Sequence, residues 1–219
     1  MRKRSLTYCV RRSFGLALIL LAGCATQVAR TEAAGPVRAA PDWRGVATAA
    51  DRTRIGNWRE AFVKGLAAAR SGGHAAEIDR EGALLAPDAA LPNPRPPAGA
   101  YRCRVIKLGA NGTAMADYTV YPSFDCRIDD EGDLASFSKL TGSQRPVGIL
   151  FGGADTRLIF LGTMMLGDER RALDYGDDPD RDMAGAVERI GAGRWRLILP
   201  YPRFESIMDV IELVPAAQG

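Results

Sequence analysis

The sequence predicts a mainly β protein of the α+β class, an antiparallel β-barrel or sandwich of about eight to nine strands preceded by a helical pair. From residue 100 onward, apolar residues recur in short runs with a period of two, which is typical of strands with one buried face. Turn-forming pairs such as Asn111-Gly112 and Gly152-Gly153 separate these runs at roughly 10-residue spacing. We favour a barrel, with the helices capping or flanking it.

The helical pair is predicted before the β region. Residues 46–70 form the first helix, because four large apolar side chains lie at helical spacing on one face. These are Ile55, Trp58, Phe62 and Leu66. Ser71-Gly72-Gly73 ends this helix, and a shorter one is expected at about 74–85. The five prolines between 87 and 97 predict a stiff, extended connector to the first strand.

The candidate strands are short and lie between these turn signals. Tyr101, Cys103 and Val105 alternate with arginines in the first of them. The full set lies at residues 101–105, 116–121, 124–128, 134–140, 146–151, 156–162, 185–191, 194–200 and 209–214. Several of these runs are apolar at successive residues, as expected where one face fills a lumen and the other contacts helices.

The first 23 residues have the three parts of a bacterial signal peptide, a basic start, a short apolar run and small residues before a cleavage point. Leu21-Ala22-Gly23-Cys24 resembles the lipobox of lipoproteins at all four positions. This resemblance implies cleavage before Cys24, diacylglycerol on its sulfur and a further acyl chain on its new amino group. Several acyl chains together make a permanent membrane anchor.

The anchor predicts both compartment and domain organisation. We expect a cell-envelope lipoprotein, with the outer membrane facing the periplasm as its location. Arg11-Arg12-Ser13-Phe14 resembles a twin-arginine signal, so the export route is left open. The predicted parts are a signal peptide at 1–23, a disordered tether at 24–41, a helical annex with its proline-rich connector at 42–99, and the barrel at 100–215.

The formal net charge of +3 does not indicate binding to nucleic acid. Removal of residues 1–23 takes away five basic residues and no acidic ones, which leaves a net charge of about −2. A near-neutral protein has no general attraction to a phosphate backbone. We therefore expect the partners to be a membrane, through the lipid, together with a small molecule or a periplasmic protein.

Cys103 and Cys126 are the cysteines that remain for pairing, and in an oxidising compartment they are expected to form a disulfide. One detail opposes this pairing. If Asn111-Gly112 closes a two-residue hairpin, Cys103 lies opposite about residue 120, and Cys126 is beyond disulfide reach. Either the strand folds back at Pro122, which we favour, or the cysteines stay unpaired.

No motif predicts a metal or a cofactor. Asp178, Asp180 and Asp182 imitate the start of a calcium-binding loop, but Met183 and Arg189 stand where that loop needs glycine and glutamate. We interpret the stretch as a solvated acidic loop, with a weak cation site as the alternative. The single histidine, His74, has no second histidine or catalytic motif to act with.

Catalysis by carboxylates alone stays open as an alternative. The candidates for such a pair are Glu169, Glu188 and Glu205. Ser136 and Lys139 match the S-x-x-K pattern of penicillin-binding enzymes. We interpret that match as chance, because two residues three apart in a strand point to opposite faces.

The C-terminal region brings several charged residues and a tryptophan together in the sequence. They are Arg189, Arg194, Trp195, Arg196 and Glu205. One interpretation is structural, a ring of charge pairs that closes one end of the barrel around Trp195. The other is functional, a barrel mouth whose arginines bind an anionic ligand. Both interpretations stay open.

Five segments resemble a proteobacterial family catalogued as domain of unknown function 4893. They are residues 101–109, 142–146, 181–185, 189–213 and the pair Glu205-Ser206 within the last of these. The resemblance runs from about residue 43 to 215 and implies that the helical annex and the β region form one unit. It implies no activity, because the family has no catalytic residues to transfer.

The expected function is therefore that of an anchored, non-catalytic envelope lipoprotein whose barrel binds a small or lipid-like ligand or a periplasmic partner. The alternative is a hydrolase of envelope glycan or lipid that uses a carboxylate pair. A purely structural link between the outer membrane and another envelope component is a third hypothesis.

Overall fold

The computed structural model describes residues 41–112 and 115–217. The predicted signal peptide, Cys24 and all but the last residue of the predicted tether lie outside these residues.

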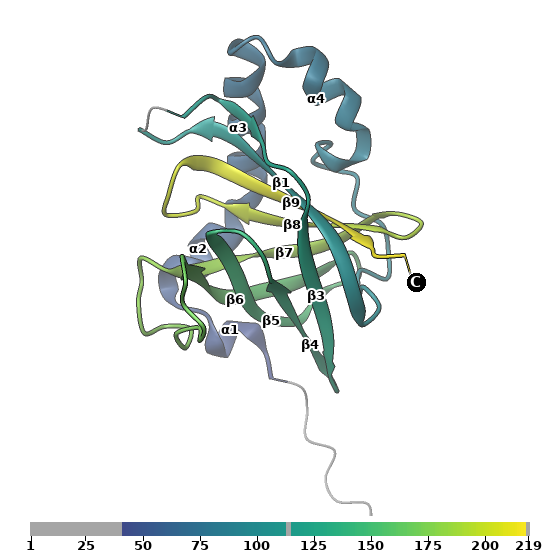
Figure 1. Ribbon diagram of the computed structural model, residues 1–219, viewed down its shortest axis with the longest axis vertical. Helices are drawn as coiled ribbons and strands as arrows, with labels where there is room; N and C mark the ends of the chain where they lie inside the picture. Colours follow the sequence, from purple (N-terminus) through teal and green to yellow (C-terminus); the bar gives the residue numbers. More distant parts are fainter. Residues whose placement is uncertain (1–40, 113–114, 218–219) are drawn as a thin grey trace, which may run out of the picture. The chain divides into compact units, whose positions relative to one another are not determined.

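The β region is a closed antiparallel barrel (Figure 1). Its strands are β1 (Gly99–Ala110), β2 (Tyr118–Val120), β3 (Phe124–Glu131), β4 (Leu134–Lys139), β5 (Gln144–Ala154), β6 (Arg157–Leu166), β7 (Asp182–Gly191), β8 (Arg194–Pro200) and β9 (Ser206–Pro215). Strands β3 to β9 pair in chain order, and β9 pairs back with β1. Eight strands thus close the barrel, β2 adds to β1, and the predicted mainly β class is confirmed.

The helical annex is more divided than predicted. It contains α1 (Trp43–Val46), α2 (Ala49–Gly56), α3 (Trp58–Ser71), α4 (Ala75–Glu81) and the 3₁₀ helix η1 (Gly82–Leu84). The single helix expected over 46–70 is wrong, because Thr48 caps a new helix through the N–H of Asp51 and Asn57 ends that helix. None of the helices in the described ranges is long and apolar enough to cross a membrane.

Apolar side chains form two cores, one on each face of the barrel wall. The lumen core fills the interior and includes Phe137, Phe160, Trp195, Leu197 and Leu213. The annex core lies between the outer face and the helices, where α3 packs along β1, β9 and β8 (Figure 1). Apolar residues on both faces explain why the runs in β6 and β8 are continuous rather than alternating.

The middle of the lumen is packed solid. Phe137 and Phe160 meet edge to face, with ring centroids 6.0 Å apart. Gly148 and Gly162 pair across β5 and β6 beside Phe160. A Cβ atom at Gly148 would lie 2.3 Å from the Leu161 carbonyl oxygen and 2.7 Å from Phe160 Cε2, so only glycine leaves room for the neighbouring strand and this ring.

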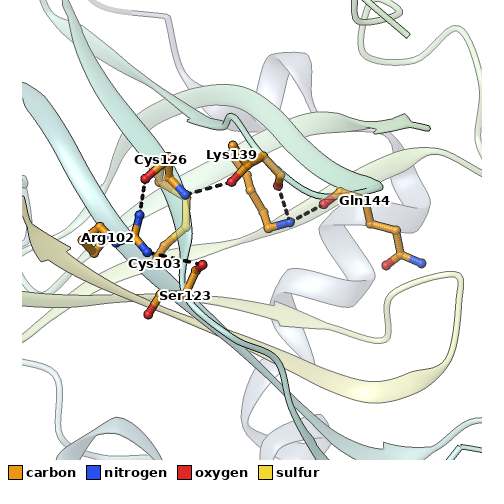
Figure 2. Close-up of a disulfide and its surroundings, with 8 residues drawn as sticks. Arg102, Cys103, Ser123, Cys126, Lys139 and Gln144 are labelled. Carbon is orange, nitrogen blue, oxygen red and sulfur yellow. Dashed lines mark hydrogen bonds and ion pairs between the residues drawn. A yellow bond between two sulfur atoms is a disulfide. The ribbon is translucent and has the colours of Figure 1, made fainter. Parts of the chain in front are cut away.

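The predicted disulfide between Cys103 and Cys126 is present, and both residues are buried in the lumen (Figure 2). The predicted position of residues 124–128 beside β1 is confirmed, but the chain does not reverse at Pro122 to reach it. β2 and β3 follow one another along the same edge of β1, so that Cys103 pairs with Phe124 rather than with residue 120. The connection after β1 is longer than a two-residue turn, which shifts the register and makes the cysteines diagonal neighbours, with Cα atoms 5.9 Å apart.

Candidate functional site

A cavity of about 280 Å³ opens at one end of the barrel, and we call it the mouth cavity. It lies where the lumen core ends, between β1, the β4–β5 turn and the loop that precedes β9. Its apolar walls are Val105, Tyr121, Phe124, Pro146, Met164 and Ile211. Its polar residues are Lys107, Lys139, Ser143, Gln144, Glu205 and Asp209.

Strand alternation carries the charged residues into this cavity. On β1 the inward positions are Tyr101, Cys103 and Val105, and Lys107 is the next of them. Asp209 lies directly opposite Lys107 in the β1–β9 register. Lys139 continues the inward series of β4 in the same way. The side chains that fill the lumen therefore change from apolar to charged in the layer that contains Lys107, Lys139 and Asp209.

Lys107 is the centre of a buried charge cluster. Its Nζ donates a 2.8 Å hydrogen bond to Asp209 Oδ2 and lies 3.2 Å from Glu205 Oε2. Lys107 is only 5 % exposed and Asp209 only 4 %. Burial alone would lower the pKa of Lys107, but the charges of the two carboxylates outweigh it, so the pKa is raised above its ordinary value. Lys107 is therefore a permanent cation at neutral pH.

Lys139 has quite different surroundings (Figure 2). Its Nζ donates to the carbonyl oxygens of Thr141 and Gln144, each at 2.8 Å, and lies 3.5 Å from the ring centroid of Phe124. Among the described residues no carboxylate pairs with it. Burial and then the positive charges of Arg145 and Lys107 lower the pKa of Lys139 to about 8.

The two lysines of the mouth cavity are thus expected to titrate far apart. In a sample whose lysines are reductively ¹³C-methylated, the Lys139 resonance should move near pH 8, and the Lys107 resonance only above pH 10.5. Lys139→Arg and Lys64→Arg variants assign the signals.

The lowered pKa of Lys139 also means that the unfolded chain binds more protons than the folded one between pH 8 and 10.5, so the contribution of Lys139 to stability rises with pH there. A Lys139 signal that is unchanged up to pH 10 would contradict this assignment.

Glu205 enters the mouth cavity from a strained loop. Its φ of 74° is in the left-handed region, which costs a non-glycine residue about 1–2 kcal/mol. Tyr201, at the start of the same loop, also has a positive φ, 46°. The Glu205 carbonyl accepts a hydrogen bond from the N–H of Asn111, and its Oε1 accepts one from Gln144 Nε2 at 3.2 Å. Strain of this kind persists where surrounding contacts hold it, often at functional sites.

Of the five predicted ligand-binding residues, the structure places only Glu205 in the mouth cavity. Trp195 points into the lumen and meets Tyr101 edge to face at 6.3 Å. Its neighbours on β8 point outward, where Arg194 pairs with Glu212 and Arg196 with Glu188. Arg189 donates to the carbonyl of Pro92 in the connector.

Arg196 is a fully buried link between barrel and annex. Its Nε donates to Glu188 Oε2 at 2.7 Å, and its guanidinium carbon lies 5.0 Å from the ring centroid of Phe62. The remaining N–H groups donate to main-chain carbonyls around η1, those of Ala83, Leu84, Ala86 and Pro87. Every contact is internal, so Arg196 holds the annex on the barrel.

The acidic loop does not gather its carboxylates. Asp178 pairs with Arg181, Asp180 with Arg203, and Asp182 is buried and accepts from the N–H of Gly176. Within the described ranges, no group of three metal-ligating side chains is close enough to hold an ion.

The carboxylates proposed for hydrolysis are also separated. Glu169 pairs with Arg181 and Glu188 with Arg196, while Glu205 alone lines the mouth cavity. The acid beside it is Asp209, which we did not predict. Ser136 points away from the lumen and Lys139 into it, as expected for residues three apart in a strand.

Lys107, Lys139 and Asp209 were not predicted as site residues, because charged residues in strands are normally assigned to the solvent face. The signal in the sequence was the alternation of faces along each strand. Lys107, Lys139 and Asp209 each lie two residues from an inward apolar residue, Val105, Phe137 and Ile211 respectively, and so point inward as well.

The folded unit is thus a small antiparallel barrel with a packed middle, a hollow charged end and a helical annex on its outer face. The chain belongs to the family described as Domain of unknown function (DUF4893), whose model matches residues 43–213. Neither the curated proteins nor the solved structures contain a match.

Proposed function

We propose that this protein is a membrane-anchored envelope lipoprotein whose barrel binds a small amphipathic ligand in the mouth cavity. The observation that carries the proposal is the cavity itself, an apolar hollow with a few fixed polar groups at the end of an otherwise packed lumen. Ligand sites typically combine these two features. At ~30 Å³ for each water-sized group, the volume admits a ligand of on the order of ten non-hydrogen atoms.

The anchor and compartment in this proposal rest on the sequence. The lipobox-like segment before Cys24 supports lipidation there, and the absence of an aspartate directly after Cys24 supports the outer membrane over retention in the inner one. A disulfide between Cys103 and Cys126 is compatible with an oxidising periplasm. In this location the cavity would meet small molecules of the envelope.

Mass spectrometry of the protein purified from membranes tests both halves of the proposal. We expect lipid on the Cys24 peptide and, under native conditions, a bound small molecule. Val105→Phe should fill the cavity and reduce the bound fraction about tenfold, as a loss of 1.4 kcal/mol would do. Val63→Phe makes the same change at an exposed position of α3 and should retain the ligand.

Each result has a distinct meaning. An unmodified Cys24 would contradict the anchor, whatever the cavity holds. Equal ligand occupancy in Val105→Phe, Val63→Phe and the unaltered protein would contradict the mouth cavity as the binding site.

The hydrolase remains the second candidate, because Glu205 and Asp209 both approach Lys107 Nζ in one cavity. Burial raises the pKa of Asp209, although Lys107 opposes this, and a raised pKa suits a general acid. The existing hydrogen bonds favour binding instead, since Asp209 already accepts from Lys107 and Ser206. A hydrolase would convert the co-purified molecule into two products during incubation, whereas a binding protein would leave it intact.

A further inference from the structure

We propose that the ligand of the mouth cavity carries a carboxylate, and that Glu205 occupies the place of this carboxylate while the cavity is empty. The inference rests on the proposed function and deepens it by naming the chemical class of the ligand. It also makes Glu205 an internal competitor that sets the affinity of the site.

The first argument is that two carboxylates lie beside Lys107, although one is enough to neutralise its charge. Asp209 neutralises it and accepts its hydrogen bond at 2.8 Å from the opposite strand. Glu205 Oε2 lies 3.2 Å from the same nitrogen, is buried, and accepts no hydrogen bond from the described residues. A second carboxylate position therefore exists beside Lys107, and Glu205 fills it with poor geometry.

The second argument is that Glu205 is the displaceable member of this cluster. Asp209 lies in the regular pairing of β9 with β1 and β8, whereas Glu205 has a strained φ of 74° in a loop. The side chain of Glu205 is 28 % exposed, compared with 5 % for Asp209. Movement of the Glu205 loop would vacate the carboxylate position without disturbing a strand.

The sign of the ligand follows from the cations around the cavity. Lys139 donates only to main-chain carbonyls, and so does Arg145, which follows the lining residue Gln144 but does not itself line the cavity. Neither forms an ion pair within the described part of the chain. Once Glu205 has moved out, the cavity holds Lys107 and Lys139 against Asp209 alone, so an incoming anion is favoured over an incoming cation.

The residue types point the same way. The chain contains 25 arginines and four lysines, yet both cationic side chains that line this cavity are lysines. An ammonium is a compact point charge, whereas a planar guanidinium would occupy much of the space beside Glu205. Phe124, Met164 and Ile211 supply apolar contacts for the rest of the ligand. A carboxylate with a short apolar chain matches both the lysines and the apolar wall of the cavity.

Octanoate and 1-octanol are matched probes, because they have the same chain length and differ in charge. Isothermal titration calorimetry should give octanoate an affinity about tenfold higher than octanol for the unaltered protein. Glu205→Gln removes the competing charge at constant size and should raise the octanoate affinity by about another tenfold, with the octanol affinity unchanged. Glu205→Gly, which accepts the positive φ without strain, is a second variant that should act in the same direction.

The controls separate this inference from the proposed function. Glu77→Gln makes the same charge change on α4, outside the cavity lining, and should alter neither affinity, whereas Val105→Phe should lower both about tenfold. If octanol binds as tightly as octanoate, or if neither Glu205 variant raises the octanoate affinity, the inference is wrong while the cavity function stands. If neither probe binds to the unaltered protein or to the Glu205 variants, the proposed function itself is wrong.

Discussion

Replacement of Arg196 by methionine is expected to destabilise the protein by about 3–5 kcal/mol, the usual cost of breaking a buried ion pair on one side. The guanidinium is completely buried and donates to Glu188 and to four carbonyl groups around η1. Methionine has a similar length but no donor. The buried Glu188 carboxylate and the buried Leu84 carbonyl would each lose a donor, and a buried polar group left without its partner costs about 1–3 kcal/mol.

Urea denaturation measures this effect, and Arg194→Met is the matched control. Arg194 is two residues away on the same strand, but it is partly exposed and shares Glu212 with Arg104. Its loss should cost less than about 1 kcal/mol, as for other exposed pairs. Equal shifts in the two variants would show that Arg196 does not hold the annex in place.

A double variant isolates the pair itself. Glu188 also contacts Arg157, so Glu188→Gln is expected to weaken two ion pairs. Because Arg196 and Glu188 touch, the double variant should lose less stability than the two single variants together, by about 0.5–3 kcal/mol. Additive losses would mean that the carbonyl contacts of Arg196, rather than its charge partner, carry the effect.

Arg196 also shows what the sequence could and could not predict. The alternation in β8 assigns Trp195 to one face and Arg194 and Arg196 to the other, which the structure confirms. Alternation cannot predict which part of the outer face of the barrel the helical annex covers. The annex packs on β8 at Arg196 while Arg194 stays at its edge, and this difference arises from tertiary packing.

The mouth cavity was hidden for a related reason. In β1 the apolar residues Ile106 and Leu108 lie on the outer face under the annex, and the charged Lys107 lies inside. Hydrophobicity alone assigns these faces the wrong way round. Only the phase carried on from Cys103 and Val105 reveals that Lys107 points into the lumen. The strand content was therefore predictable, and the charged end of the lumen was not.

Loss of the Cys103–Cys126 disulfide is the second large effect expected. The crosslinked residues are 23 apart in sequence, and a loop of this length predicts a loss of about 3 kcal/mol when both cysteines become alanine. The strands β1 and β3 still pair without the crosslink, so the barrel should fold with a lower urea midpoint. The two alanine variants made singly would leave a free thiol, which is why the double variant is the proper measure.

The disulfide also borders the mouth cavity, and this gives the prediction a second readout. Cys126 pairs with Lys139 across β3 and β4 (Figure 2). Phe124, two residues before Cys126, lies under the Lys139 ammonium. Loosening this edge should weaken ligand binding as well as lower stability. Reductant added to the folded, unaltered protein should have little effect, because both sulfur-bearing side chains are almost fully buried and the bond becomes accessible only on unfolding. A double variant with an unchanged urea midpoint would show that strand pairing alone sets the stability of this edge.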